Sequence, residues 1–215
     1  VRVFTRSVQS TYFVMQRSEM QNELRAAANE VSRDLQQAGT GIPLGGVTIP
    51  QSGVGGGTNP LFGADGTTTY LAANNLFTQG RLYKVSPGYN ASNVGPLRTP
   101  PQSDALVIAY TDPNLDWSSY TTTSLASNGT TLTMPAATAP AVNDTALGIT
   151  TGDIILLQNS VGNAIGDVTS VNGGARTITF ANGDPLNMNQ SGATQGNIAA
   201  LQSGGSYPAV TVSRL

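Results

Sequence analysis

The residue types that most often carry out chemistry in proteins are sparse or absent in this chain. The 215 residues include no histidine and no cysteine, which excludes a Ser-His-Asp triad and a thiol nucleophile. Lys84 is the only lysine, and no Ser-x-x-Lys motif contains it. Zinc binding is disfavoured because its usual ligands are cysteine and histidine. The sequence therefore predicts a protein that is not an enzyme and that uses no cofactor.

Two aspartates come nearest to a hydrolytic site. Asp112 and Asp116 are separated by Pro113-Asn114-Leu115, and a pair of carboxylates is what glycoside hydrolysis requires. Aspartate and proline also form turns, by local hydrogen bonding and by a fixed backbone angle. We interpret this segment as a turn, and a hydrolase that uses the two aspartates is the least favoured function.

Oxygen ligands at alternate positions begin two possible calcium sites, because Ca²⁺ prefers oxygen ligands. Neither matches the full twelve-residue calcium loop with its terminal glutamate. The sequence therefore assigns no metal ligand and leaves calcium open at both places. The first is Asp112, Asn114 and Asp116, and the second is Asn182, Asp184 and Asn187.

The overall charge gives no sign of a nucleic-acid partner. The formal net charge is −2, and no basic patch stands out along the chain. Charged residues make up 10% of the sequence, against about a quarter in ordinary soluble proteins. Aromatic residues could form a sugar-stacking platform at Trp117, Tyr110 and Tyr120, although a buried cluster is the preferred interpretation.

The first 38 residues form a distinct segment that predicts one long helix. They contain no glycine and no proline, whereas all 25 glycines and 12 prolines lie from residue 39 onward. Apolar residues recur at steps of three and four, which predicts an amphipathic helix with these residues on one face. Gly39 would end the helix, and about 36 helical residues would span roughly 54 Å. The apolar positions are Phe4, Val8, Tyr12, Phe13, Met20, Leu24, Ala27, Ala28, Val31, Leu35 and Ala38.

The rest of the chain predicts short strands between turns. Residues 39–103 form a loop-rich connecting region with short strands, and residues 104–215 form an antiparallel β-rich domain. Strands do not alternate with helices, so the predicted class is α+β, with the long helix packed on an antiparallel sheet. A hairpin turn is expected at Asn172-Gly173-Gly174. We expect strands near 67–71, 81–85, 104–110, 130–134, 153–158, 164–171, 176–180 and 209–213.

Two stretches carry a resemblance to a known family. The end of the helix has the pattern Ser-Arg-Asp-Leu-x-x-Ala-Gly over residues 32–39, after a stretch that includes several glutamines. Similar β segments follow at residues 152–157, 168–171 and 183–187. Together they resemble the W-type minor pilins of type IV pili and the J-type pseudopilins of type II secretion. The resemblance implies a pilin-like fold.

The resemblance also implies a function, a location and partners. The chain would be a structural subunit of a bacterial cell-surface filament, held in the inner membrane before assembly by a helical segment upstream of Val1. Its partners would be other pilin subunits. The cysteine-closed loop of many pilins is in doubt because this chain has no cysteine. The residues we expect on the assembly face are Phe13, Met20, Leu24, Ala27, Val31 and Leu35.

A second hypothesis assigns the chain to a different class. The β-rich region, with its uncharged surface and its aromatic residues, would also suit a secreted adhesin or carbohydrate-binding domain. Under that hypothesis, Trp117 would contact the ligand.

Overall fold

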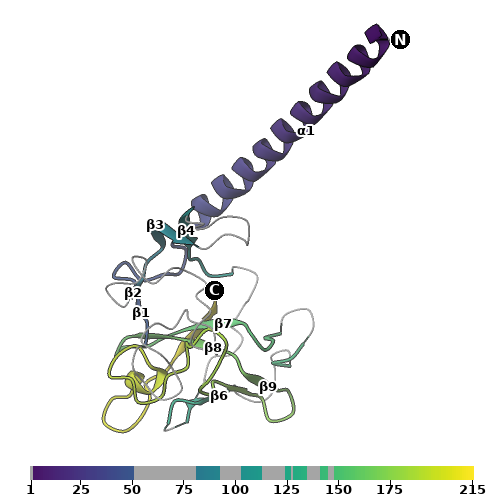
Figure 1. Ribbon diagram of the computed structural model, residues 1–215. Coiled ribbons are helices and arrows are strands. Elements are labelled where there is room, and N and C mark those ends of the chain that lie inside the picture. Colours follow the sequence, from purple (N-terminus) through teal and green to yellow (C-terminus); the bar gives the residue numbers. More distant parts are fainter. Residues whose placement is uncertain are drawn as a thin grey trace. The chain divides into compact units, whose positions relative to one another are not determined.

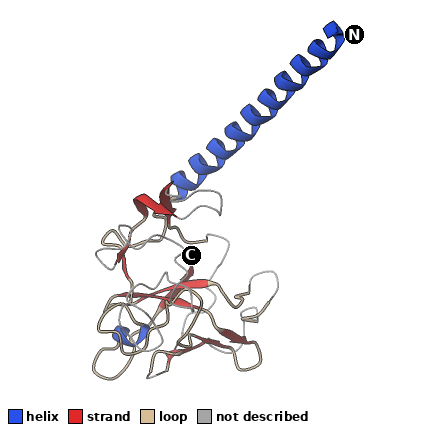
Figure 2. Cartoon of the chain, viewed as in Figure 1, coloured by secondary structure: helices blue, strands red, loops and turns tan. Residues whose placement is uncertain are grey.

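A computed structural model describes residues 2–50, 81–92, 103–112, 124–126, 128–134, 141–144 and 148–215 (Figure 1). Contacts divide the chain into two compact units, Val1–Ala38 and Gly39–Leu215. The first unit is helical and the second is built from antiparallel strands, with one short 3-10 turn at Ile198–Leu201 (Figure 2). The observed class is therefore α+β.

Helix α1 extends over Arg2–Gln37, as the sequence predicted. Its 36 residues contain neither glycine, which weakens a helix, nor proline, which breaks its hydrogen-bond ladder. At its end, the Ala38 N–H donates to the carbonyl of Leu35 over 3.3 Å, which tightens the last turn. Gly39 follows with φ +85°, the left-handed conformation that ends helices and that glycine adopts readily.

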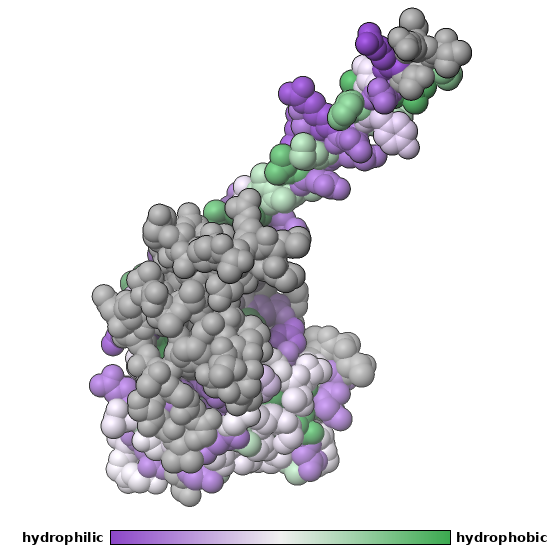
Figure 3. All heavy atoms as spheres, in the orientation of Figure 1, coloured by the Kyte–Doolittle hydropathy of each residue, from purple (hydrophilic) through white to green (hydrophobic). Residues whose placement is uncertain are grey.

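The apolar residues of α1 do not lie on one face, so the single-face prediction was wrong. Successive residues of an α-helix turn by about 100° around the axis. Phe4, Val8 and Tyr12 therefore share one face, but the single step from Tyr12 to Phe13 moves the next apolar run away from it. Steps of four hold from Phe4 to Tyr12, and steps of four and three hold from Met20 to Ala27, but the step between Tyr12 and Phe13 is one. On the face of the helix that Figure 3 shows, apolar and polar side chains are interspersed.

The described residues of the second unit form two main antiparallel sheets and two smaller strand pairs. One sheet has the order β5-β6-β10-β9 and the other β11-β7-β8, while β1 pairs with β2 and β3 with β4. The strands are β1 Val47–Thr48, β2 Arg81–Leu82, β3 Val85–Ser92, β4 Ser103–Ile108, β5 Ser124–Leu125, β6 Thr131–Thr133, β7 Ile154–Gln158, β8 Asn163–Asp167, β9 Ser170–Asn172, β10 Thr177–Thr179 and β11 Thr211–Arg214.

Strand β7 lies at the centre of the core, buried on both faces. Ile155 and Leu157 belong to a cluster that also includes side chains of the four-stranded sheet, such as Leu132. Leu156 points the other way, into a second cluster with Val47 of β1. All five side chains are fully buried. Alternate residues of a strand face opposite sides of the sheet, so this apolar run is stable only if other side chains pack on both faces of β7.

The second cluster joins the two regions that the sequence separated at residue 103. Val47 and Leu82 come from the expected connecting region, and they pack with Leu156 and Ile165 of the expected β-rich domain. The expected boundary also falls inside strand β4, which begins at Ser103. Residues 39–215 therefore form one unit.

Most expected strands lie close to observed ones, and one expected run divides in two. Residues 164–171 form the end of β8 and the start of β9, because the chain changes sheets between them. The Val168 N–H donates to the carbonyl of Asp153, next to β7, whereas the Thr169 N–H donates to the carbonyl of Thr179 in β10. The hairpin at residues 172–174 is confirmed, since β9 and β10 pair across it. The strand expected at 67–71 lies outside the described residues.

Candidate interaction surface

The expected assembly residues share one face of α1, which we call the second stripe: Phe13, Met20, Leu24, Ala27, Val31 and Leu35. At about 100° per residue, they lie within an arc of about 80°, along about 33 Å of helix. Their side chains are exposed: 72% for Phe13, 64% for Leu24 and 48% for Val31. An apolar stripe of this length in contact with water is a site for interaction with another apolar surface.

Charged residues border the second stripe differently on its two sides. Glu19, Glu23 and Glu30 follow one border, and Arg17 and Arg25 lie toward the other, by the same 100° rule. All five are exposed. An apolar stripe between charged borders is typical of a helix that packs against another helix, where the charges determine which partner binds.

Another apolar face lies nearer the N-terminal end of α1, and its residues were not among those expected on the assembly face. We call it the first stripe: Phe4, Val8, Tyr12 and Met15. Their side chains are exposed by 75%, 45%, 66% and 60%. The first stripe points about 145° away from the second around the helix axis. The sequence did carry a sign of this second apolar face. Tyr12 and Phe13 are adjacent, and adjacent residues of a helix cannot belong to one narrow stripe.

The carboxylate suspected of hydrolysis holds a strand in place. Arg214 of β11 hydrogen-bonds Asp112 through its guanidinium, and its other amino group lies 3.7 Å from the Asp153 carboxylate. The hydrogen bond with Asp112 raises the pKa of Arg214. The Asp112 N–H also donates to the Arg214 carbonyl over 2.8 Å. Asp116 lies outside the described residues, so the suspected pair is not brought together here.

The second possible calcium site is an internally bonded loop. The two carboxylate oxygens of Asp184 each accept a backbone N–H over 2.8 Å, from Met188 and Asn189. The Asn182 side chain donates to the Ser191 hydroxyl and accepts the Ser191 N–H. In the described part of the chain, no three histidine, cysteine, aspartate or glutamate side chains are placed so that they could hold a metal ion.

Beside this loop, Asp167 is a functional candidate that the sequence did not reveal. Its side chain is 2% exposed, and its Oδ1 atom accepts no hydrogen bond from the described residues. Burial raises the pKa of Asp167 to about 6, and the neighbouring carboxylates of Asp184 and Asp153 contribute. Asn189 fixes the backbone there: it accepts the Asp167 N–H over 3.0 Å and donates to the Asp167 carbonyl over 2.7 Å.

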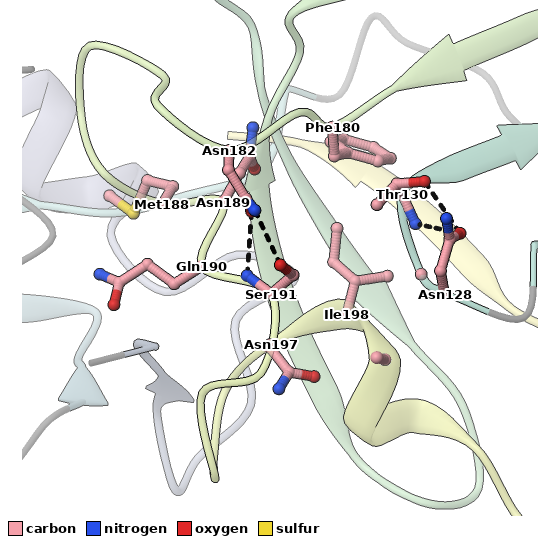
Figure 4. A pocket seen from close by; sticks show the side chains of 12 residues that line it. Asn128, Thr130, Phe180, Asn182, Met188, Asn189, Gln190, Ser191, Asn197 and Ile198 are labelled. Carbon is pink, nitrogen blue, oxygen red and sulfur yellow. Dashed lines mark hydrogen bonds between the residues drawn. The ribbon is translucent and has the colours of Figure 1, made fainter. Parts of the chain in front are cut away.

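A small hollow is lined in part by residues 188–191 of the same loop (Figure 4). Its cavity volume of about 20 Å³ is room for one or two water molecules. Its amide side chains bond within the protein: Asn128 accepts from Thr130, and Asn182 pairs with Ser191. Phe180, its aromatic lining residue, is 3% exposed and offers no face for a sugar. Trp117, which the adhesin hypothesis places at the ligand, lies outside the described residues.

Comparisons with known proteins provide no relative: no protein-family model, no curated protein and no solved structure matches this chain. In the part of the chain that is described, no helix has the length and apolar character needed to cross a bilayer.

Proposed function

We propose that this chain is a structural subunit of a bacterial type IV pilus or related pseudopilus filament, and that it assembles through α1. The observation that carries the proposal is the second stripe, whose large apolar side chains are exposed by 42% to 72% along the helix. The β unit has two apolar clusters of its own, made of residues from Ile42 onward. A β unit with its own core, joined to a long helix that exposes large apolar side chains, suits a subunit that is held in an assembly by its helix.

The size of the stripe favours repeated contacts over a single pair. Full burial of a large apolar side chain contributes about 1.5–3 kcal/mol, so covering a half-exposed one contributes about 1 kcal/mol. The five large residues of the second stripe would then contribute about 5 kcal/mol, close to the lower estimates of what association costs. One such contact is marginal. Several contacts per subunit, as in a filament, would be stable.

The finer architecture belongs to the same proposal. In a pilin-like arrangement, part of α1 packs on the antiparallel sheet of its own subunit, and the β unit faces out from the filament. Before assembly, residues upstream of Val1 would hold the subunit in the inner membrane. The partners are other pilin subunits at the bacterial cell surface, and the scarcity of catalytic side chains agrees with a purely structural role.

The test compares two variants of the full-length protein, expressed in its own bacterium. One variant carries an added negative charge in the second stripe, and the other carries it elsewhere on the helix. Val31→Asp places a carboxylate in the second stripe, whereas Asn29→Asp adds the same charge about 160° away around the helix. We expect the Asn29→Asp variant in filaments sheared from the cells, and the Val31→Asp variant only in the cell membrane fraction. Equal amounts of both variants in the filaments, or the absence of the unmodified protein from them, would refute the proposal.

A further inference from the structure

Two buried carboxyl groups meet where the loop of residues 181–191 lies against the end of strand β8. Asp167 is the last residue of β8 and Asp184 belongs to the loop, and the two residues are 2% and 1% exposed. Burial is the largest cause of the raised pKa of Asp167. The charge of Asp184 and a side-chain hydrogen bond to it also contribute, which places the two carboxyl groups in contact. Because adjacent negative charges repel strongly away from water, the pair is stable when it holds one proton.

The hydrogen bonds around the pair favour Asp167 as the group that carries this proton. Both oxygens of Asp184 accept backbone N–H groups, from Met188 and Asn189, and such donors favour an ionised carboxylate. The Oδ1 atom of Asp167 accepts no hydrogen bond from the described residues. A protonated Asp167 has an O–H group that can donate to the Asp184 carboxylate, so one proton satisfies both side chains.

The loop that carries Asp184 also covers part of the core. Asn189 fastens the loop to β8, since its side chain accepts the Asp167 N–H and donates to the Asp167 carbonyl. Met188 is 4% exposed and belongs to the same apolar cluster as Ile165 of β8. If the loop moved away from β8, water would reach the two carboxyl groups and these apolar side chains together.

We propose that the 181–191 loop is a proton-controlled latch: one proton shared by Asp167 and Asp184 holds it closed on β8, and loss of that proton lets it open. Opening returns the two charges to water and uncovers apolar side chains of the second cluster. The β unit therefore presents a surface near neutral pH that it lacks in acid. The latch lies wholly within the β unit, so it does not depend on assembly through α1.

The charged groups that face the pair determine the pH at which the latch works. Asp153 adds a further negative charge, while Arg214 is bonded to Asp112 and lies against Asp153. Burial and the carboxylates of Asp184 and Asp153 raise the pKa of Asp167 from 3.8 to about 6. The proton therefore stabilises the closed loop fully below pH 3.8, and this stabilisation is lost as the pH rises through about 6. If Asp167 has its ordinary pKa in the open loop, the equilibrium constant for opening rises roughly sixtyfold from pH 4 to pH 7.5.

Hydrogen exchange of the purified chain, followed by NMR, measures the opening directly. The reporters are the Met188 and Asn189 N–H groups, which bond to Asp184. The reference is the Met134 N–H, which is hydrogen-bonded at the four-stranded sheet, outside the loop. Exchange rates are divided by the intrinsic rates at pH 4 and pH 7.5, with and without a low concentration of urea. The unmodified protein is compared with Asp167→Asn, which keeps the shape of the side chain and cannot ionise.

We expect the reporters to exchange through openings that urea does not promote and that are about sixtyfold more frequent at pH 7.5 than at pH 4. In Asp167→Asn this rise should disappear. The Met134 N–H should exchange more slowly and respond to urea, because its exposure requires a larger unfolding.

Three results would overturn the latch. The first is that the reporters match the Met134 N–H in rate and in urea response, since the loop would then not open separately. The second is a pH response that persists in Asp167→Asn. The third is closing of the loop at pH 7.5 by millimolar calcium, because the carboxyl pair would then bind a cation in place of the proton.

Discussion

The buried carboxyl of Asp167 makes the stability of the β unit depend on pH in a predictable direction. Burial, together with the carboxylates of Asp184 and Asp153, raises its pKa from 3.8 to about 6. The folded protein therefore holds this proton more tightly than the unfolded chain does. The nearby cation, Arg214, lies against Asp153 and is bonded to Asp112, so it does not pair with Asp167.

The sign and size of the effect follow from linkage. The stabilising contribution of protonated Asp167 is fully present below pH 3.8 and is lost as the pH rises through about 6. Each tenfold change in proton affinity corresponds to about 1.4 kcal/mol, so the total loss by pH 7.5 is about 3 kcal/mol. That is a large part of the free energy of unfolding of an ordinary domain.

Urea unfolding at several pH values measures this loss, with the fluorescence of the single tryptophan, Trp117, as the probe. Asp167→Asn cannot ionise, so we expect its free energy of unfolding to exceed that of the unmodified protein by about 3 kcal/mol at pH 7.5 but by only about 0.6 kcal/mol at pH 4. Glu23→Gln removes the same charge from the exposed helix and serves as the control. If the difference between the Asp167→Asn variant and the unmodified protein stayed constant from pH 4 to 7.5, the reasoning about Asp167 would be wrong.

Two further predictions concern the packing of the β unit. Gly129 has φ +71°, and a Cβ there would stand 2.6 Å from the Ala199 nitrogen, so Gly129→Ala should lower the free energy of unfolding by about 2 kcal/mol or more. Gly183 has a similar φ of +83° and open space around it, so Gly183→Ala should cost only about 1 kcal/mol, and equal losses in thermal unfolding would contradict the steric argument. Arg214→Leu removes the partly exposed ion pair with Asp112 and should cost about 1 kcal/mol in 0.05 M salt but clearly less in 1 M salt. A loss that did not vary with salt would assign the effect to packing of the side chain.

The helix could be predicted from the sequence because its signals are local. The absence of glycine and proline before residue 39 and the left-handed glycine at that position require no knowledge of distant residues. The strands were located by apolar runs between turns, as at β7. What the runs could not reveal was which sheet each strand joins. The division at Val168 and Thr169 depends on partners at Asp153 and Thr179, which lie 15 and 10 residues away.

The roles of the candidate residues in the β unit also depend on residues distant in the sequence, so the sequence alone could not predict them. Oxygen-bearing side chains at alternate positions can surround a cation or bind the backbone of their own loop, and spacing alone does not distinguish the two. Asp184 does the latter, since its oxygens accept the N–H groups four and five residues later. Asp167 gave no signal, because its burial results from the loop that Asn189 fastens to it from 22 residues away.

The two stripes of α1 bear directly on what the helix can assemble. If all its apolar residues lay on one face, a single partner could cover them, and two copies could satisfy each other in a closed dimer. A helix whose apolar residues change face between Tyr12 and Phe13 needs a partner on each side. Each contact alone is marginal, at a few kcal/mol from half-exposed side chains. The chain is therefore expected to remain unassembled when dilute and to associate through both stripes once copies are concentrated.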